Sequence, residues 1–121
     1  MEKKKTLIIG ASENPARYSY LALNKLKAYG HPVMAIGKKA AIVNGIEIIT
    51  RQDPITEIDT VTLYLNPVHQ KAYYNYILSL QPKRIIFNPG AENDELAQLA
   101  IGHGIRVQEA CTLVLLSTGQ Y

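Results

Sequence analysis

The residues with the clearest chemical potential form one short loop, Gly10-Ala11-Ser12-Glu13-Asn14-Pro15, which follows an apolar segment and precedes a helical pattern. A dinucleotide-binding loop of pattern G-x-G-x-x-G would stand at this place. Only Gly10 matches that pattern, because Ser12 and Pro15 stand where the second and third glycines would be. Serine is nearly as small as glycine and adds a hydroxyl donor, while the N–H groups at a helix start favour an anion. The loop therefore predicts a phosphate-binding site.

The helix after this loop has two alternative starting points. Asn14 could cap it, with Pro15 as the first helical residue. Alternatively, the loop continues to Ser19, which would then cap the helix. We favour the longer loop because it lets Arg17 point at the ligand.

A second chemical feature is the basic turn Gly37-Lys38-Lys39, which follows the next apolar segment. An NAD site has an acidic residue at this position, which accepts hydrogen bonds from the ribose hydroxyls. A lysine would instead attract a phosphorylated ribose, which NADP carries at its 2′ position and coenzyme A at its 3′ position. The turn predicts a ligand of this kind, unless Lys38 and Lys39 are simply exposed turn residues.

The elements that must position these turns alternate between strand and helix. Five segments have the short apolar pattern of buried strands: 6–10, 32–37, 60–65, 84–87 and 105–108. Helical spacing marks 18–29, 73–80 and 96–100, and we expect a helical turn at Asp53-Pro54 and a short helix or coil at 113–116. Asn44-Gly45 predicts a small hairpin within 41–49. The pattern predicts an α/β fold: a mainly parallel, five-stranded, doubly wound sheet in three layers, with residues 1–121 as one domain.

In open sheets of this kind the ligand lies beyond the carboxyl ends of the strands, where the strand order reverses. Each of the five predicted strands ends in a short turn: 10–12, 37–39, 65–67, 88–90 and 109–111. Any one turn could use Gly, Pro or Asn only for its shape. The first two turns together are stronger evidence of a ligand site than any one turn, because they combine a phosphate loop with a basic turn.

Composition excludes several classes of protein. Apolar residues make up 47% and charged residues 19% of the 121 residues, and no apolar run is long enough for a membrane span or a signal peptide. The single cysteine, Cys111, excludes an intrachain disulfide framework. The net charge is +3, and residues 1–39 hold eight Lys or Arg against two Glu, but no nucleic-acid-binding motif accompanies them. We expect a cytoplasmic protein with a small-molecule ligand, no metal, and no nucleic acid or membrane partner.

At these two turns the chain resembles the small coenzyme A-binding proteins and the amino-terminal domain of the succinyl-coenzyme A synthetase alpha subunit. Residues 10–15, with Ser19-Tyr20 behind them, are similar to the family's opening G-A-S-x-N-P…S-Y loop. Ile36-Gly37-Lys38-Lys39 resembles the synthetase's P-G-K-G turn, whose lysine contacts the coenzyme, whereas the small proteins usually have Asn-Pro there. The resemblance covers nearly the whole chain and implies a Rossmann-like fold.

Three later segments support the resemblance. Tyr64-Leu65-Asn66-Pro67 falls where the synthetase has its V-P-P segment along the coenzyme, and residues 88–93 resemble the family's Gly-x-x-Asn-Glu turn. Cys111 falls on a cysteine found in the last turn of both groups. Turns and resemblance together give the expected cofactor-binding residues: Gly10, Ala11, Ser12, Asn14, Arg17, Ser19, Gly37, Lys38, Lys39, Asn66, Pro67, Asn88, Pro89, Gly90 and Cys111.

These features favour a module that binds coenzyme A or an acyl-coenzyme A and has no catalytic machinery of its own. The synthetase carries its phosphorylated histidine in a second domain, to which nothing in this chain corresponds. His31, His69 and His103 are expected to be solvated turn residues, and none has the spacing of a ligand pair or dyad.

Two alternative functions stay open. One is an NADP-dependent oxidoreductase domain. The other is a nucleotide-binding subunit that docks on a separate catalytic partner, which the apolar segment 113–116 suggests; a homodimer is a further option. Cys111 is either a small buried residue or a thiol near the coenzyme's own thiol, where it could form a mixed disulfide.

Overall fold

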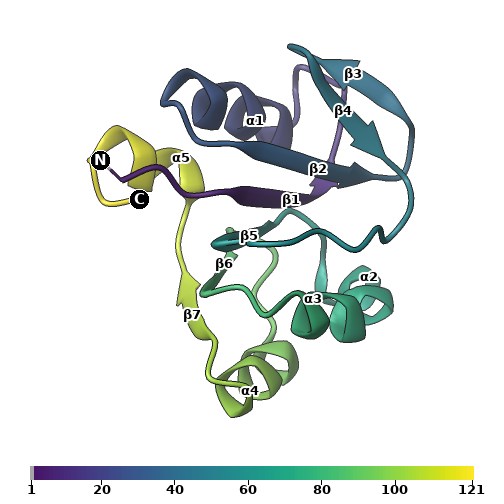
Figure 1. Ribbon diagram of the computed structural model, residues 1–121, viewed down its shortest axis with the longest axis vertical. Coiled ribbons are helices and arrows are strands. Elements are labelled where there is room, and N and C mark those ends of the chain that lie inside the picture. The colour runs from purple at the N-terminus through teal and green to yellow at the C-terminus, as the bar shows by residue number, and fades with distance from the viewer. Residues whose placement is uncertain (1) are drawn as a thin grey trace.

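Seven strands form one sheet in the order β3-β4-β2-β1-β5-β6-β7, in a computed structural model that describes residues 2–121 (Figure 1). The strands are β1 (Thr6–Ala11), β2 (Val33–Gly37), β3 (Ala41–Val43), β4 (Ile46–Ile49), β5 (Thr60–Leu63), β6 (Arg84–Phe87) and β7 (Arg106–Glu109). The helices are α1 (Tyr18–Ala28), α2 (Pro67–Gln70), the 3-10 turn η1 (Lys71–Tyr73), α3 (Tyr74–Leu80), α4 (Asp94–Gly102) and α5 (Thr112–Ser117). None of these helices is long and apolar enough to cross a membrane.

The sheet is Rossmann-like, and its strand order reverses at β1. The chain leaves β1 for β2 on one side and later returns to β5 on the other, and both pairings with β1 are parallel. The next strands, β6 and β7, add outward in parallel. The reversal places the loop after β1 and the loop after β5 on opposite sides of one crevice at the carboxyl edge of the sheet.

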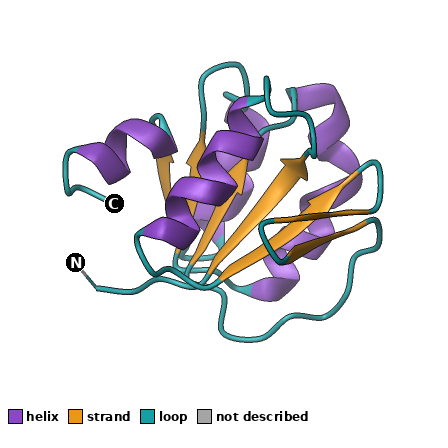
Figure 2. Ribbon diagram, turned by 90° about the horizontal axis from the view of Figure 1, so that it is seen from above, coloured by secondary structure: helices purple, strands orange, loops and turns teal. Residues whose placement is uncertain are grey.

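Two helical layers cover the sheet, as the three-layer prediction requires (Figure 2). Successive residues of β1 face opposite layers. Ile8 packs in a core with Leu23 and Leu26 of α1 and Leu115 of α5. On the other face, Leu7 and Ile9 pack in a core with residues of α3 and α4: Tyr76, Ile77, Leu96 and Ala100. Burial of these two apolar sets fixes the sheet between its helices and holds the carboxyl edge in place.

The prediction of five strands is wrong, because the hairpin joins the same sheet. Asn44-Gly45 makes the expected turn, and β3 and β4 pair antiparallel across it. β4 also pairs in parallel with β2, with Ala35 opposite Ile48. The hairpin thereby satisfies backbone groups along an edge of β2 that would otherwise be unpaired.

The prediction of a helical turn at Asp53-Pro54 is also wrong, since residues 52–59 contain no helix. The Tyr76 hydroxyl donates to the carbonyl oxygen of Asp53 at 2.6 Å, so this carbonyl is bound to α3. By contrast, the helical region predicted at 73–80 begins six residues earlier, at Pro67.

His31 is not the solvated turn residue that we expected, because only 3% of it is exposed. Its Nδ1 accepts from the backbone N–H of Lys4 at 2.9 Å, and its ring packs on Tyr121 with 4.9 Å between centroids. Burial, with the charges of Lys3, Lys4 and Arg84, lowers the pKa of His31, so the neutral ring is favoured. His31 therefore belongs to the packing at the amino ends of the strands, far from the crevice.

Candidate functional site

The first turn of the site begins at a bulge in β1. Gly10 has a φ of +95°, and a Cβ at this position would lie 2.8 Å from the carbonyl oxygen of Tyr64. The pairing register with β2 shifts between Ile9 and Ala11. Glycine is required here because it tolerates both the positive φ and the close approach of the neighbouring backbone.

Side chains of the loop after β1 hold its shape. The Ser12 Oγ accepts from the Asn14 N–H at 3.0 Å, and the Asn14 Oδ1 accepts from the Ala16 N–H at 3.0 Å. The Arg17 N–H donates to the Asn14 carbonyl at 3.0 Å. Because the Ser12 oxygen acts as an acceptor within the loop, its own proton stays available to a ligand.

The helix after the loop starts late, as the longer-loop alternative predicts. α1 begins at Tyr18 with Arg17 at the N-cap, and no side chain caps it. The prediction that Ser19 caps the helix is wrong, because Ser19 lies inside the first turn and is only 4% exposed. The first N–H groups of a helix have no intrahelical partner, and both Tyr18 and Ser19 line the crevice.

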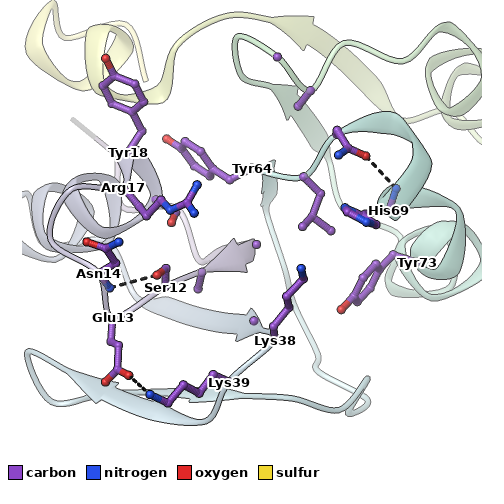
Figure 3. Close-up of a pocket in the computed structure, with 18 of the residues that line it drawn as sticks. Ser12, Glu13, Asn14, Arg17, Tyr18, Lys38, Lys39, Tyr64, His69 and Tyr73 are labelled. Atoms are coloured by element: carbon purple, nitrogen blue, oxygen red, sulfur yellow. Dashed lines mark hydrogen bonds and ion pairs between the residues drawn. The ribbon is translucent and has the colours of Figure 1, made fainter.

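The second turn follows β2 and touches the first. A Cβ on Gly37 would lie 2.3 Å from the carbonyl oxygen of Ala11, so the two turns are in backbone contact. Lys38 points into the crevice, whereas Lys39 turns aside to Glu13, with 2.7 Å between Nζ and Oε1 (Figure 3). The hydrogen bond and the charge of Glu13 raise the pKa of Lys39.

The opposite wall is built by the turns after β5 and β6. Asn66 caps α2, because its side chain accepts from the His69 N–H at 3.1 Å. Gln70 is fully buried, and its Nε2 donates to the carbonyl of Leu65 at 2.8 Å and to that of Ala91 at 2.7 Å. One side chain thus joins the two turns of this wall.

Together the turns line an open cavity of about 840 Å³ at the carboxyl edge of the sheet. Its walls contain twelve of the fifteen residues expected to bind a cofactor: Gly10, Ala11, Ser12, Asn14, Arg17, Ser19, Gly37, Lys38, Lys39, Asn66, Pro89 and Gly90. These residues come from four of the five strand ends that the sequence marks, so the structure brings them together as the switch-point argument expects.

Pro67, Asn88 and Cys111 do not line the cavity. Pro67 is the first residue of α2. Asn88 is buried: its Nδ2 donates to the Thr62 hydroxyl at 2.7 Å, and its Oδ1 accepts from the Thr112 N–H at 2.9 Å. Asn88 therefore connects β5 to α5. Cys111 is half-buried at the N-cap of α5.

The cavity is equipped to hold an anion. Arg17, Lys38 and Lys39 line it, together with the Ser12 hydroxyl, and Glu13 is its one carboxylate. Burial raises the pKa of Tyr64, which keeps this phenol neutral. No group of three or more His, Cys, Asp or Glu that could hold a metal ion occurs within residues 2–121.

A family model described as a CoA binding domain matches residues 4–117, nearly the whole chain. The chain belongs to this CoA-binding domain family. The match covers every strand and helix around the cavity, so the expected resemblance is confirmed for the fold and the family.

Solved structures share the fold of this CoA-binding domain. A crystal structure of an uncharacterized protein has 50% sequence identity and a TM-score of 0.98, over 100% of both chains. A hypothetical protein from Pyrococcus horikoshii has 22% identity and a TM-score of 0.87, over 96% of this chain and 83% of that one. A Thermus thermophilus protein has 18% identity and a TM-score of 0.80, over 98% and 91%. The similarity to the Pyrococcus and Thermus proteins shows only that the fold is shared. A comparison with curated protein sequences finds no match.

Seven cavity residues of the CoA-binding domain were not predicted: Glu13, Tyr18, Tyr64, Leu65, His69, Tyr73 and Ala91. Most of them adjoin predicted residues in the chain. His69 and Tyr73 lie in the first and second turns of the helical region that starts at Pro67. Asn66-Pro67 is a helix-start signal that could have located them, but we interpret this pair in the sequence as a strand end and a coenzyme contact, not as the start of a helix.

We expect Gln70→Leu to lower the free energy of unfolding by about 2–3 kcal/mol, because it removes the donor to the half-buried carbonyl of Leu65 and to the buried carbonyl of Ala91. Urea denaturation measures the change. Gln52→Leu is the control, since Gln52 donates to the Ala72 carbonyl from an exposed position and its loss should cost less than about 1 kcal/mol. Equal effects of the two substitutions would show that Gln70 does not hold the wall.

Proposed function

We propose that this CoA-binding domain binds coenzyme A, free or acylated, in the cavity at the carboxyl edge of its sheet. One observation carries the proposal. The loop with the free Ser12 proton and the turn with Lys38 are in backbone contact, so one ligand can reach both. Coenzyme A carries a pyrophosphate and a ribose phosphate on the same adenosine, and these two turns offer one site for each.

The size of the cavity supports a ligand of this kind. Its volume of about 840 Å³ lies toward the upper end of the range for small-molecule and cofactor sites. The wall that faces Lys38 carries larger side chains, among them Tyr64, Leu65 and Tyr73, which can pack against the less polar parts of a ligand. The polar wall would hold the phosphates.

We further propose that residues 1–121 act as one cytoplasmic binding module without catalytic groups of its own. A reaction of the ligand would then need a separate catalytic subunit as partner, and a homodimer is the alternative assembly. The apolar side chains of Tyr18, Leu21 and Val114 are 71%, 44% and 55% exposed on α1 and α5, where such a partner could pack.

Isothermal titration calorimetry with coenzyme A, NADP and NAD tests the ligand. Coenzyme A should bind and raise the melting temperature, since a ligand that binds only the folded state stabilises it by RT ln(1 + [L]/Kd). NADP is the critical comparison because it also carries a ribose phosphate. Binding of NADP but not of coenzyme A at millimolar concentration would overturn the proposal in favour of a nicotinamide site.

We expect Lys38→Ala to weaken coenzyme A binding by about ten- to a hundredfold, because it removes a charge-assisted contact with the ribose phosphate. Dephospho-coenzyme A lacks that phosphate, so its affinity should change by less than about threefold. Calorimetric titration of both ligands measures the difference.

Lys83→Ala provides the matched control for Lys38→Ala. Lys83 is exposed next to the start of β6, at the opposite edge of the sheet. Its substitution therefore removes the same charge at a place far from the cavity. Its substitution should leave both affinities unchanged. An equal loss for the two ligands in Lys38→Ala would show that Lys38 does not contact the ribose phosphate.

A further inference from the structure

Glu13 is a carboxylate in a wall that otherwise suits an anion. Among the residues that line the cavity, it is the only acidic one, and it sits between Ser12 and Asn14 in the phosphate loop. A negative charge at this point opposes a phosphorylated ligand, because like charges repel at close range. Neither the phosphate loop nor the lysine turn needs this charge for its backbone shape.

The Glu13 side chain leaves its own loop and reaches the lysine turn. Its Oε1 lies 2.7 Å from the Lys39 Nζ, and the dashed line in Figure 3 joins the two side chains. The ion pairs within residues 2–121 are this one and Arg51–Asp53, so the neighbouring Lys38 remains outside any ion pair. One lysine of the turn is therefore held by a carboxylate, and the other faces the cavity.

The ion pair is easily broken by a ligand. The side chains are 80% exposed for Lys39 and 47% exposed for Glu13. Exposed pairs of this kind contribute little to stability, since water screens them and long side chains lose freedom when they pair. A phosphate dianion carries more charge than one carboxylate, so it can draw Lys39 away from Glu13.

We propose that Glu13 is a specificity-determining residue, which reduces the preference of the site for ligands with a ribose phosphate by competing with that phosphate for Lys39. This inference rests on the proposed binding of coenzyme A in this cavity. A ligand without the ribose phosphate leaves the Glu13–Lys39 pair intact. A ligand with the ribose phosphate must displace Glu13 before Lys39 can contact that phosphate.

The test compares the affinities of coenzyme A and dephospho-coenzyme A by calorimetry. Glu13→Gln should raise the preference for coenzyme A by about three- to tenfold, because Lys39 is then free. Glu13→Gln combined with Lys39→Gln should lose this gain. Asp53→Asn is the matched control: it removes one negative charge and the other ion pair, and it should leave the preference unchanged.

An unchanged preference in Glu13→Gln would overturn the inference, and the affinities themselves would then show the reason. If both affinities also stayed at their wild-type values, the pair would be a surface contact without effect on the ligand. If both affinities fell by a similar factor, Glu13 would accept from the ribose hydroxyls instead. If the wild-type protein bound neither ligand, the proposed function itself would be wrong, and the inference would fall with it. Failure of the inference alone would instead appear only in the comparison of the variants.

Discussion

Gly37→Ala should lower the free energy of unfolding by about 3 kcal/mol and weaken coenzyme A binding at the same time. The new Cβ would lie 2.3 Å from the carbonyl oxygen of Ala11 and 3.0 Å from the Ile48 Cγ2. The nearest of these atoms belongs to the backbone, so the two turns themselves must move apart. Thermal denaturation and calorimetric titration of one sample measure both effects.

Gly102→Ala is the matched control for this substitution. Gly102 is the last residue of α4, has no positive φ, and has no atom within 4 Å of a Cβ placed on it. Alanine should therefore be neutral or slightly stabilising there, since it favours helix. If Gly37→Ala behaved like Gly102→Ala, the two turns would not depend on their close contact.

Ser12→Asp should reduce coenzyme A affinity by about a hundredfold or more while the protein stays folded. The aspartate carboxylate can still accept from the Asn14 N–H, as the Ser12 oxygen does at 3.0 Å, so the loop keeps its turn. The added charge then faces the pyrophosphate and repels it. Calorimetry measures affinity, and circular dichroism checks the fold.

Ser12→Asn separates charge from shape. Asparagine is close to aspartate in size and accepts the same hydrogen bond from Asn14, but it carries no charge. The affinity of the Ser12→Asn variant for coenzyme A should fall by less than about tenfold. Similar losses for the two variants would mean that side-chain size, and not repulsion of a phosphate, disturbs binding at Ser12.

Structural features that depend on residues close together in the chain could be predicted from the sequence. Gly10 and Gly37 stand where the backbone turns sharply or is crowded, and Asn44-Gly45 makes the hairpin turn that its type requires. The switch-point rule then places strand ends from distant parts of the chain around one cavity. That rule depends on topology alone, which is why most of the expected residues line the cavity.

Features that depend on side-chain direction or on strand pairing could not be predicted. The hairpin signal does not say which strand β4 will join. Glu13 meets Lys39 only because β1 and β2 are neighbours in register. Asn88 has the residue type of a ligand contact, yet its amide is used inside the fold. Such pairings are decided by tertiary packing, which no local pattern encodes.

Chemical-shift mapping of the backbone amides during a titration with coenzyme A would show directly whether the coenzyme binds in this cavity. We expect the largest shifts at the amides of Ser12, Lys38, Asn66 and Gly90, which line the cavity on four different turns. Amides near His31, at the opposite edge of the sheet, should not move. Shifts confined to other regions, or none at saturating coenzyme A, would show that this cavity does not bind the coenzyme.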